Sequence, residues 1–536
     1  MKEKNRLTSG FDTVSNEISI PNITLTQVLD QSVSKWPENI AISYYEEKWT
    51  YSQLKREVET FASALQQIGV QKGDRVALML PNCPQYIVSY YGILTVGGVV
   101  VQINPMFTER ELHYLISDSG SSTIIALESA GSLISSVQHD TKLKNTILVN
   151  TESMKESKQQ QELSYETFKK KSTGVIKPVS LDPAEDLAII QYTGGTTGRS
   201  KGAMLTHRNL IANIVQHTIL FKGTLLPGVE RVLTVIPLFH VYGMTLCMNM
   251  GIYQGSQLIL HSRFNRDEVL QTIQREKPTY FPGVPTMYIA LNSHPEVEKY
   301  GMNNIKVCHC GGSSLPLELL NEFEQKTGTN IFEAYGLSET SPGAICQSPY
   351  EQRIHGSVGT PLPGTKIRIV DFKKPVQEVA PGERGELLIK GPQVMKGYWN
   401  MPEETKNTLI QDGWLSTGDI AKMDKEGNVF IVDRKKDLII ASGYNIYPRE
   451  IEEVLYEHPA VLEAAVIGVP DAYRGETVKA VVALKEGQNL SAEELSDHCR
   501  KNLSSYKVPR IIEFRSELPK TTVGKILRRS LRETLK

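Results

Sequence analysis

The stretch Tyr192-Thr193-Gly194-Gly195-Thr196-Thr197-Gly198-Arg199-Ser200-Lys201-Gly202 follows the strand-like segment 187–191. Its glycines permit tight turns that expose backbone N–H groups, while the hydroxyl side chains and Lys201 add donors and positive charge. This composition indicates a loop that wraps phosphate groups. It is not a Walker A loop, because the Gly-Lys-Ser/Thr ending is absent. The alternative, a flexible surface loop, is disfavoured by the density of glycine and hydroxyl residues.

A second informative segment is Pro519-Lys520-Thr521-Thr522-Val523-Gly524-Lys525, more than three hundred residues downstream. A lysine on a short Thr/Gly loop is poorly placed for packing but well placed to reach into another domain. Taken with the phosphate-type loop, it predicts an enzyme that handles ATP between two domains. A solvated tail lysine is the alternative interpretation of Lys525.

Length and composition limit the classes of protein. A chain of 536 residues is too long for one core, so two or more domains are expected. Lys+Arg 59 against Asp+Glu 60 leaves a formal charge of -1, which argues against a nucleic-acid partner. Six scattered cysteines indicate a reducing compartment. Cys308-His309-Cys310 is either half of a metal site or, as we favour, the end of a buried strand.

The sequence predicts a cytoplasmic protein. Charged residues 1–6 are followed by no apolar segment, so no signal peptide is expected. The most apolar run, 86–103, contains glycines and hydroxyl residues and predicts a buried helix, a glycine turn and a strand, with a membrane span as the weaker alternative. The sequence excludes neither peripheral contact with a membrane nor the formation of a homodimer.

Hydrophobic periodicity predicts an α/β fold. Helical segments such as 53–68 alternate with apolar strand segments such as 74–80, which indicates mostly parallel sheets covered by helices. After about Gly356 shorter segments at 365–370, 385–390 and 428–432 predict an antiparallel β subdomain. The last hundred residues resemble a small, mobile α+β domain, in which Ser491 and Glu494 form a capping box.

The predicted architecture is therefore a large N-terminal domain with two helix-covered, mostly parallel sheets and a β subdomain, followed by the small C-terminal domain. We place the large N-terminal domain at residues 1–433, a short connection at 434–436, and the small C-terminal domain at 437–536. The boundary falls in the charged run 433–437.

Several motifs, in the same order along the chain, resemble those of the adenylate-forming superfamily, which includes acyl-CoA synthetases, firefly luciferase and peptide-synthetase adenylation domains. The resemblance extends from about Trp49 to Arg529 and is strongest to bacterial long- and medium-chain fatty acyl-CoA synthetases. It implies ATP, Mg²⁺ and coenzyme A as cofactors, and a fatty acid, ATP and CoA as small-molecule substrates. It also implies that the N-terminal domain, 1–433, binds AMP and the acyl group, that 434–436 is a hinge, and that the C-terminal domain, 437–536, is a lid.

The resemblance assigns a nucleotide site. The segment 333–339 would place Tyr335 against adenine, the Ser338 hydroxyl at the α-phosphate and the Glu339 carboxylate on Mg²⁺, where many relatives have Thr in place of Ser338. A core aromatic residue and a solvated helix cap are the alternatives for Tyr335 and Glu339. The implied nucleotide-binding residues are Thr193, Gly194, Gly195, Thr196, Thr197, Gly198, Lys201, Gly311, Gly312, Ser313, Glu333, Ala334, Tyr335, Gly336 and Ser338.

Further implied residues lie towards the C-terminus. The Asp419 carboxylate would accept hydrogen bonds from both ribose hydroxyls, and Arg434 would contact ribose and phosphate. Lys436 occupies the hinge position, although an ordinary surface lysine is a strong alternative. Gly443 would let the pantetheine arm of CoA pass close to the backbone. Lys525 would bridge the substrate carboxylate and the α-phosphate.

The segment 237–244 resembles the wall of the acyl pocket, with His240 near the carboxylate. General-base catalysis by His240 is disfavoured, because a carboxylic acid is already ionised near neutral pH. The implied substrate-binding residues are His240, Met244, Gly283 and Pro285, and the implied catalytic residues are Lys525, Glu339, Thr193 and Ser338.

We therefore predict an AMP-forming fatty acyl-CoA synthetase. An aryl-CoA ligase of the coumarate or benzoate type is the first alternative, and an acyl-AMP ligase serving a separate carrier protein is the second. From a different class, a non-catalytic lipid- or nucleotide-binding scaffold is disfavoured, because Thr193, Glu339, Asp419, Arg434 and Lys525 are all present.

Overall fold

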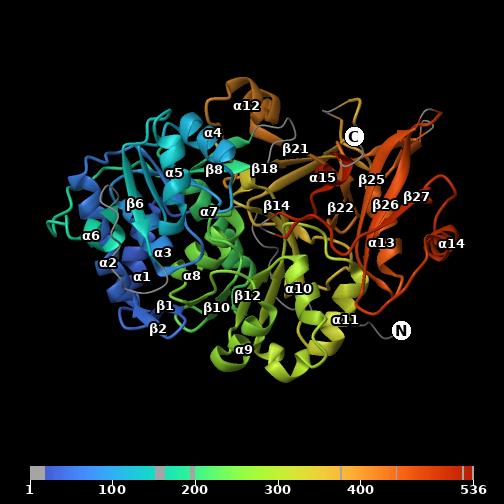
Figure 1. The fold of residues 1–536 in the computed structure, drawn as a ribbon, viewed down its shortest axis with the longest axis horizontal. Helices are drawn as coiled ribbons and strands as arrows, with labels where there is room; N and C mark the ends of the chain where they lie inside the picture. Colours follow the sequence, from blue (N-terminus) through green and yellow to red (C-terminus); the bar gives the residue numbers. More distant parts are fainter. Residues whose placement is uncertain are drawn as a thin grey trace, which may run out of the picture.

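A computed structural model describes residues 18–150, 163–193, 200–374, 377–441, 444–471, 473–521 and 524–533. Helices and sheets from the first three hundred and fifty or so residues fill the left and centre of Figure 1, and the sheet of β25, β26 and β27 lies at the opposite end. The chain thus crosses from one end of the molecule to the other, and α15 (Arg528–Glu533) lies nearer the centre than that sheet (Figure 1).

The N-terminal sheet has the strand order β19-β9-β8-β4-β3-β5-β6-β7. Its core strands pair in parallel, since they are short, apolar and buried on both faces. At one side of the sheet β8 pairs antiparallel with β9, and β9 pairs antiparallel with the edge strand β19. The strands are β3 (Arg75–Met79), β4 (Val99–Gln102), β5 (Thr123–Leu127), β6 (Asn145–Val149), β7 (Leu163–Ser164), β8 (Leu187–Thr193), β9 (Lys201–Thr206) and β19 (Gly397–Tyr398).

The central sheet has the strand order β16-β15-β14-β13-β12-β10-β11-β1-β2 and is parallel from β1 through β14. Because parallel strands end at one edge, the segments that follow β10, β12, β13 and β14 meet there. The strands are β1 (Ile40–Tyr44), β2 (Glu47–Thr50), β10 (Arg231–Thr234), β11 (Gln257–Leu260), β12 (Tyr280–Gly283), β13 (Val307–Cys310), β14 (Ile331–Gly336), β15 (Gly343–Cys346) and β16 (Thr360–Pro361).

Helices cover these two sheets and share one large apolar core. Helix α2 begins after Thr50, whose side chain accepts from the Gln53 amide in a capping box, and it buries one face with Leu54, Val58 and Phe61. The α-helices are α1 (Leu25–Lys35), α2 (Tyr51–Gln67), α3 (Pro84–Thr95), α4 (Glu109–Ser119), α5 (Gly131–Gln138), α6 (Tyr165–Lys169), α7 (His207–Leu220), α8 (Met250–Tyr253), α9 (Arg266–Glu276), α10 (Pro285–Asn292) and α11 (Leu317–Thr327).

Short helices of other types link these elements. A π-helix, η2 (Gly243–Asn249), leads directly into α8, and all its residues are buried. Such widened turns occur often at functional sites. The 3-10 helices are η1 (Glu128–Ala130), η3 (Val297–Tyr300), η4 (Met302–Asn304), η5 (Ser338–Thr340) and η6 (Gln411–Gly413).

The β subdomain is an antiparallel sheet in which β17, β18, β21 and β20 are neighbours and β22 pairs with β21. It joins the central sheet through Val429, which exchanges backbone hydrogen bonds with Val358 and Gly359. The strands are β17 (Lys366–Val370), β18 (Gly385–Lys390), β20 (Leu409–Ile410), β21 (Trp414–Met423) and β22 (Val429–Arg434), and helix α12 is Pro402–Thr408.

The C-terminal part forms a separate sheet with its own apolar clusters. Helix α14 starts at the predicted capping box, where the Ser491 hydroxyl accepts from the Glu494 amide. The strands are β23 (Ile439–Ala441), β24 (Tyr444–Ile446), β25 (Val461–Asp471), β26 (Gly475–Leu484) and β27 (Ile511–Phe514), and the helices are α13 (Pro448–Tyr456), α14 (Ala492–Asn502) and α15 (Arg528–Glu533).

The predicted fold class is confirmed, and the run 86–103 forms a buried helix, a glycine turn and a strand, as expected. Cys308-His309-Cys310 lies in the buried strand β13, and the described residues contain no cluster of three or more metal-ligating side chains. In the same described ranges no helix is long and apolar enough to span a membrane. The division at 433 and 436 stays a prediction.

The junction between the central sheet and the β subdomain gives a stability prediction. At Gly359, φ is +93° and an added Cβ would lie 2.2 Å from the Cys346 backbone, whereas at Gly356, φ is +79° and an added Cβ meets nothing within 4 Å. Gly359→Ala should therefore cost about 2–5 kcal/mol, against about 1–2 for the control Gly356→Ala. Thermal denaturation measures the difference, and equal losses for both variants would contradict it.

Candidate active site

The Asp419 carboxylate is held from two sides. Asp419 lies in β21 and is only 4% exposed. The Tyr335 hydroxyl, from the end of β14, donates to Asp419 Oδ2 over 2.5 Å, and Arg434 Nε lies 3.4 Å from Oδ1. Burial and the adjacent carboxylate raise the pKa of Tyr335 well above its usual value, so the phenol stays a donor. The site thus joins the central sheet to the β subdomain.

Glu339 lies in η5, which follows β14. Tyr398 in β19 donates its hydroxyl to Glu339 Oε1 over 2.7 Å, and the Met395 amide donates to the Glu339 carbonyl oxygen over 2.8 Å. Glu339 lies next to β9, the strand that follows the predicted phosphate loop, and a single carboxylate there fits Mg²⁺, which in nucleotide enzymes takes one or two protein carboxylates and completes its shell with phosphate and water. Ser338 precedes it and is partly buried.

The phosphate-type loop is described only at its two ends. Thr193 and Lys201 are partners across the β8–β9 hairpin, and the Thr193 hydroxyl lies 3.5 Å from the Lys201 carbonyl oxygen. Lys201 Nζ lies 2.5 Å from Glu404 Oε2 of α12 and 5.3 Å from the centre of the Tyr398 ring. The predicted residues Gly194, Gly195, Thr196, Thr197 and Gly198 lie outside the described residues.

The predicted adenine segment lies at the shared edge of the central sheet. The Gly311 amide donates to the Gly283 carbonyl oxygen over 3.3 Å, and a Cβ on Gly311 would lie 3.6 Å from the Ala334 carbonyl oxygen. At Gly336 an added Cβ would lie 1.9 Å from the Pro342 carbonyl oxygen, so only glycine fits. Gly312 and Ser313 are exposed.

Glu333 is a buried acid in β14, 4% exposed, whose amide donates to Gln347 Oε1 over 3.0 Å. Burial raises the pKa of Glu333 to about 7, against the opposing charge of Arg449 from α13. The carboxyl group therefore exchanges protons near neutral pH and can present either a donor or an acceptor.

The predicted acyl-pocket residues cluster around the π-helix. His240 Nδ1 accepts from the Tyr242 amide over 3.2 Å, and Met244 is fully buried. Burial and the charge of Lys525 lower the pKa of His240 to about 4, so its imidazole is neutral. Gly283 ends β12, and Pro285 is buried at the first position of α10.

Tyr242 lies in the predicted acyl-pocket segment 237–244, but the sequence did not single it out as a candidate site residue. Its hydroxyl lies 2.6 Å from His309 Nδ1 and 3.3 Å from the Gly283 carbonyl oxygen. A Cβ on Gly311 would lie 3.6 Å from its ring. Tyr242 therefore fills the space between the predicted adenine and acyl segments, and its place next to His240 and Gly243 was the available signal.

Lys525 reaches this site from the C-terminal part. The Thr521 amide donates to the Lys525 carbonyl oxygen over 2.7 Å, and Gly524 has φ of +77°. A Cβ on Gly524 would lie 2.2 Å from Thr286 Oγ1 in α10, so Gly524 packs directly against the start of this helix. Desolvation and then the Arg434 charge lower the pKa of Lys525 to about 7, with Asp419 opposing.

Charged side chains connect the C-terminal part to the β subdomain. Arg384 of the β subdomain pairs with Glu450 of α13, and the Arg449 guanidinium donates to the Ile431 carbonyl oxygen. Arg528, three residues after Lys525, pairs within the C-terminal part, 2.6 Å from Glu452 and 3.5 Å from Asp437. Lys436 is exposed between β22 and β23. Gly443 lies outside the described residues.

Comparisons with known proteins agree with this geometry. Residues 29–399 match the model of the AMP-binding enzyme family, and residues 450–525 match the AMP-binding enzyme C-terminal domain. The chain belongs to this AMP-binding enzyme family. It is 46% identical to a long-chain-fatty-acid–CoA ligase of Bacillus subtilis (strain 168), over 97% of this chain and 96% of the relative.

Two solved structures are similar over nearly their whole length. The anthranilate CoA ligase AuaEII in complex with anthranoyl-AMP is 27% identical, with a TM-score of 0.89 over 96% of this chain and 98% of that one. ATP-bound MatB from Rhodopseudomonas palustris is 30% identical, with a TM-score of 0.86 over 96% and 99%. The predicted resemblance to adenylate-forming enzymes is confirmed.

The docked loop gives a prediction about Gly524. Gly524→Ala should lower the rate of acyl-adenylate formation about a hundredfold, because its Cβ would collide with Thr286 and displace Lys525. Adding Thr286→Ala should recover part of that rate. ATP–pyrophosphate exchange measures this step.

Gly487→Ala is the matched control, since Gly487 has φ of +75° in the same C-terminal part but an added Cβ there meets nothing within 4 Å. It should keep the wild-type exchange rate. An equal loss in the Gly524 and Gly487 variants would mean that backbone strain, rather than docking, explains the effect.

Proposed function

We propose that this protein is an acid–thiol ligase that joins a fatty acid to coenzyme A through an acyl-adenylate, releasing AMP and pyrophosphate. The observation that carries this proposal is the delivery of Lys525, from the C-terminal part, to a position where its charge interacts with Asp419 and Arg434 on one side and with His240 on the other. The 46% identity to a bacterial long-chain-fatty-acid–CoA ligase supports the fatty acid as the substrate.

In the first step a carboxylate oxygen of the acid forms a bond to the α-phosphorus of ATP. The bond from this phosphorus to the bridging oxygen breaks, and pyrophosphate leaves with the electron pair. The main barrier is the approach of two anions, which a preorganised cation offsets as charge develops. Lys525 is that cation, and its lowered pKa reflects a site that is unfavourable for a positive charge until anions arrive.

The other residues orient the nucleotide. Asp419, fixed by Tyr335 and Arg434, accepts hydrogen bonds from the ribose hydroxyls. The Tyr335 ring and the Gly311–Gly312–Ser313 segment enclose adenine beside Glu333, Ala334 and Gly336. The Ser338 hydroxyl meets the α-phosphate, while Thr193, Lys201 and the loop between them hold the remaining phosphates.

Glu339 is positioned to hold Mg²⁺, which when bound neutralises charge on the phosphates of ATP. His240 stays neutral and, with Met244, Gly283 and Pro285, forms the wall of the acyl pocket. An imidazole of low pKa suits this role, because the substrate carboxylate needs no base.

In the second step the CoA sulfur forms a bond to the acyl carbon, the mixed anhydride bond breaks, AMP leaves with the electron pair, and the thiol proton is released to solvent. Lys525 occupies the site in the present conformation. We infer that the C-terminal part, from 437 onward, rotates about Lys436 before this step, withdrawing Lys525 and bringing in Gly443.

We place the enzyme in the cytoplasm, a proposal supported by the six buried, unpaired cysteines. The substrates are small molecules: fatty acid, ATP and CoA. Peripheral membrane contact and a homodimer stay predictions.

A second candidate function is aryl-CoA ligation. It is favoured by the high structural similarity to an anthranilate CoA ligase, whose acid is aromatic. An acyl-AMP ligase serving a carrier protein is the remaining alternative from the sequence.

A substrate panel tests these functions directly. CoA-dependent AMP release should be measured with MgATP, saturated fatty acids of increasing length, coumarate and benzoate. We expect an optimum among the longer fatty acids. An optimum with coumarate or benzoate would establish the aryl alternative, and pyrophosphate release without any CoA dependence would establish an acyl-AMP ligase.

A further inference from the structure

One short segment, 397–405, contacts two residues of the predicted nucleotide site. These are Lys201, which follows the phosphate-type loop, and Glu339, the predicted Mg²⁺ ligand. Tyr398 donates its hydroxyl to Glu339 Oε1, and its ring lies under the Lys201 ammonium. Glu404, six residues later, pairs with Lys201 at 2.5 Å. A single segment therefore contacts both the carboxylate and the cation of the nucleotide site.

The segment is built to keep these contacts together. Strand β19 pairs with β9, so Tyr398 lies opposite Ala203, two residues beyond Lys201. The Tyr398 amide donates to Thr405 Oγ1 over 2.8 Å, which ties the strand to α12 next to Glu404. The Trp399 amide also donates to the Gly202 carbonyl oxygen over 2.7 Å. The Tyr398 ring and Glu404 are therefore fixed relative to the exit of the loop.

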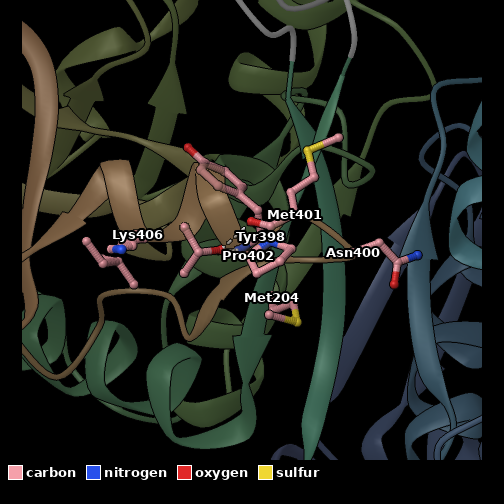
Figure 2. A pocket seen from close by; sticks show the side chains of 8 residues that line it. Met204, Tyr398, Asn400, Met401, Pro402 and Lys406 are labelled. Atoms are coloured by element: carbon pink, nitrogen blue, oxygen red, sulfur yellow. Dashed lines mark hydrogen bonds between the residues drawn. The ribbon is translucent and has the colours of Figure 1, made fainter.

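The Lys201–Glu404 pair is unequal in its exposure. The Lys201 side chain is 15% exposed, while that of Glu404 is 41% exposed. A surface pocket of about 440 Å³ lies between α12 and β9, lined by Met204, Tyr398, Met401, Pro402 and Lys406 among others (Figure 2). The Glu404 carboxylate is thus the more solvent-exposed partner of the pair, and it can leave Lys201 without disturbing the core.

We propose that Tyr398 and Glu404 are positioning residues for the nucleotide: Tyr398 orients the Glu339 carboxylate, and Glu404 is an internal anion that holds Lys201 until the terminal phosphates of ATP replace it. This rests on the proposed function, since it assumes that Lys201 serves ATP. Glu404 competes with phosphate for one ammonium group, so it limits the affinity for ATP and favours release of pyrophosphate.

Nucleotide binding to the full-length protein, measured by calorimetry without acid or CoA, tests this inference apart from turnover. Glu404→Gln should tighten MgATP binding about two- to fivefold, the range expected for a partly exposed ion pair. AMP, which lacks the terminal phosphates, should bind unchanged. Glu403→Gln is the matched control, because Glu403 is an exposed glutamate on the same helix, and it should leave both affinities unchanged.

Tyr398→Phe is the second arm. Loss of the hydroxyl should raise the Mg²⁺ concentration that half-saturates ATP binding about tenfold, as for other residues that orient a metal ligand. AMP binding without Mg²⁺ should not change.

Weaker or unchanged MgATP binding by the Glu404 variant, or an equal change for AMP, would overturn the role of Glu404. An unaltered Mg²⁺ dependence would overturn that of Tyr398. Failure of the wild-type protein to bind MgATP would instead contradict the proposed function.

Discussion

The arrangement depends on a lysine that is carried across a domain boundary and desolvated. A cation in a low-dielectric site is costly unless anions surround it. Here Asp419 supplies one negative charge, while Arg434, Arg528 and Lys436 oppose the ammonium group of Lys525. The site around Lys525 therefore carries excess positive charge. The negative charges of an ionised acid and a nucleotide phosphate would balance it. Substrate binding and domain closure favour one another for this reason.

Parallel strand topology explains where the site lies. The carboxyl ends of β10, β12, β13 and β14 bring His240, Gly283, Gly311 and the segment that starts at Glu333 to one edge of the central sheet. The β subdomain adds Asp419 and Arg434 in adjacent strands, where they face each other in register. Each sheet contributes only part of the site, so its geometry requires the junction between them.

Local patterns predicted the elements well and the contacts poorly. The segments 74–80 and 53–68 correspond to β3 and α2 within two residues at each end, because apolar spacing along the chain largely sets those elements. The pairing of Tyr335 with Asp419 joins residues 84 positions apart, and no spacing rule reveals it. The π-helix at 243–249 and the partners of Lys201 and Glu339 were missed for the same reason, since they arise from tertiary packing.

We propose that Lys525 serves adenylate formation and leaves the site before the thioester step. Both half-reactions of Lys525→Ala should be measured, with ATP–pyrophosphate exchange for the first and CoA plus supplied acyl-AMP for the second. Lys520→Ala is the control, because Lys520 lies on the same loop but pairs with Glu463 at 2.6 Å. We expect a loss of about a hundredfold or more in the first half-reaction only. Equal losses in both half-reactions would contradict it.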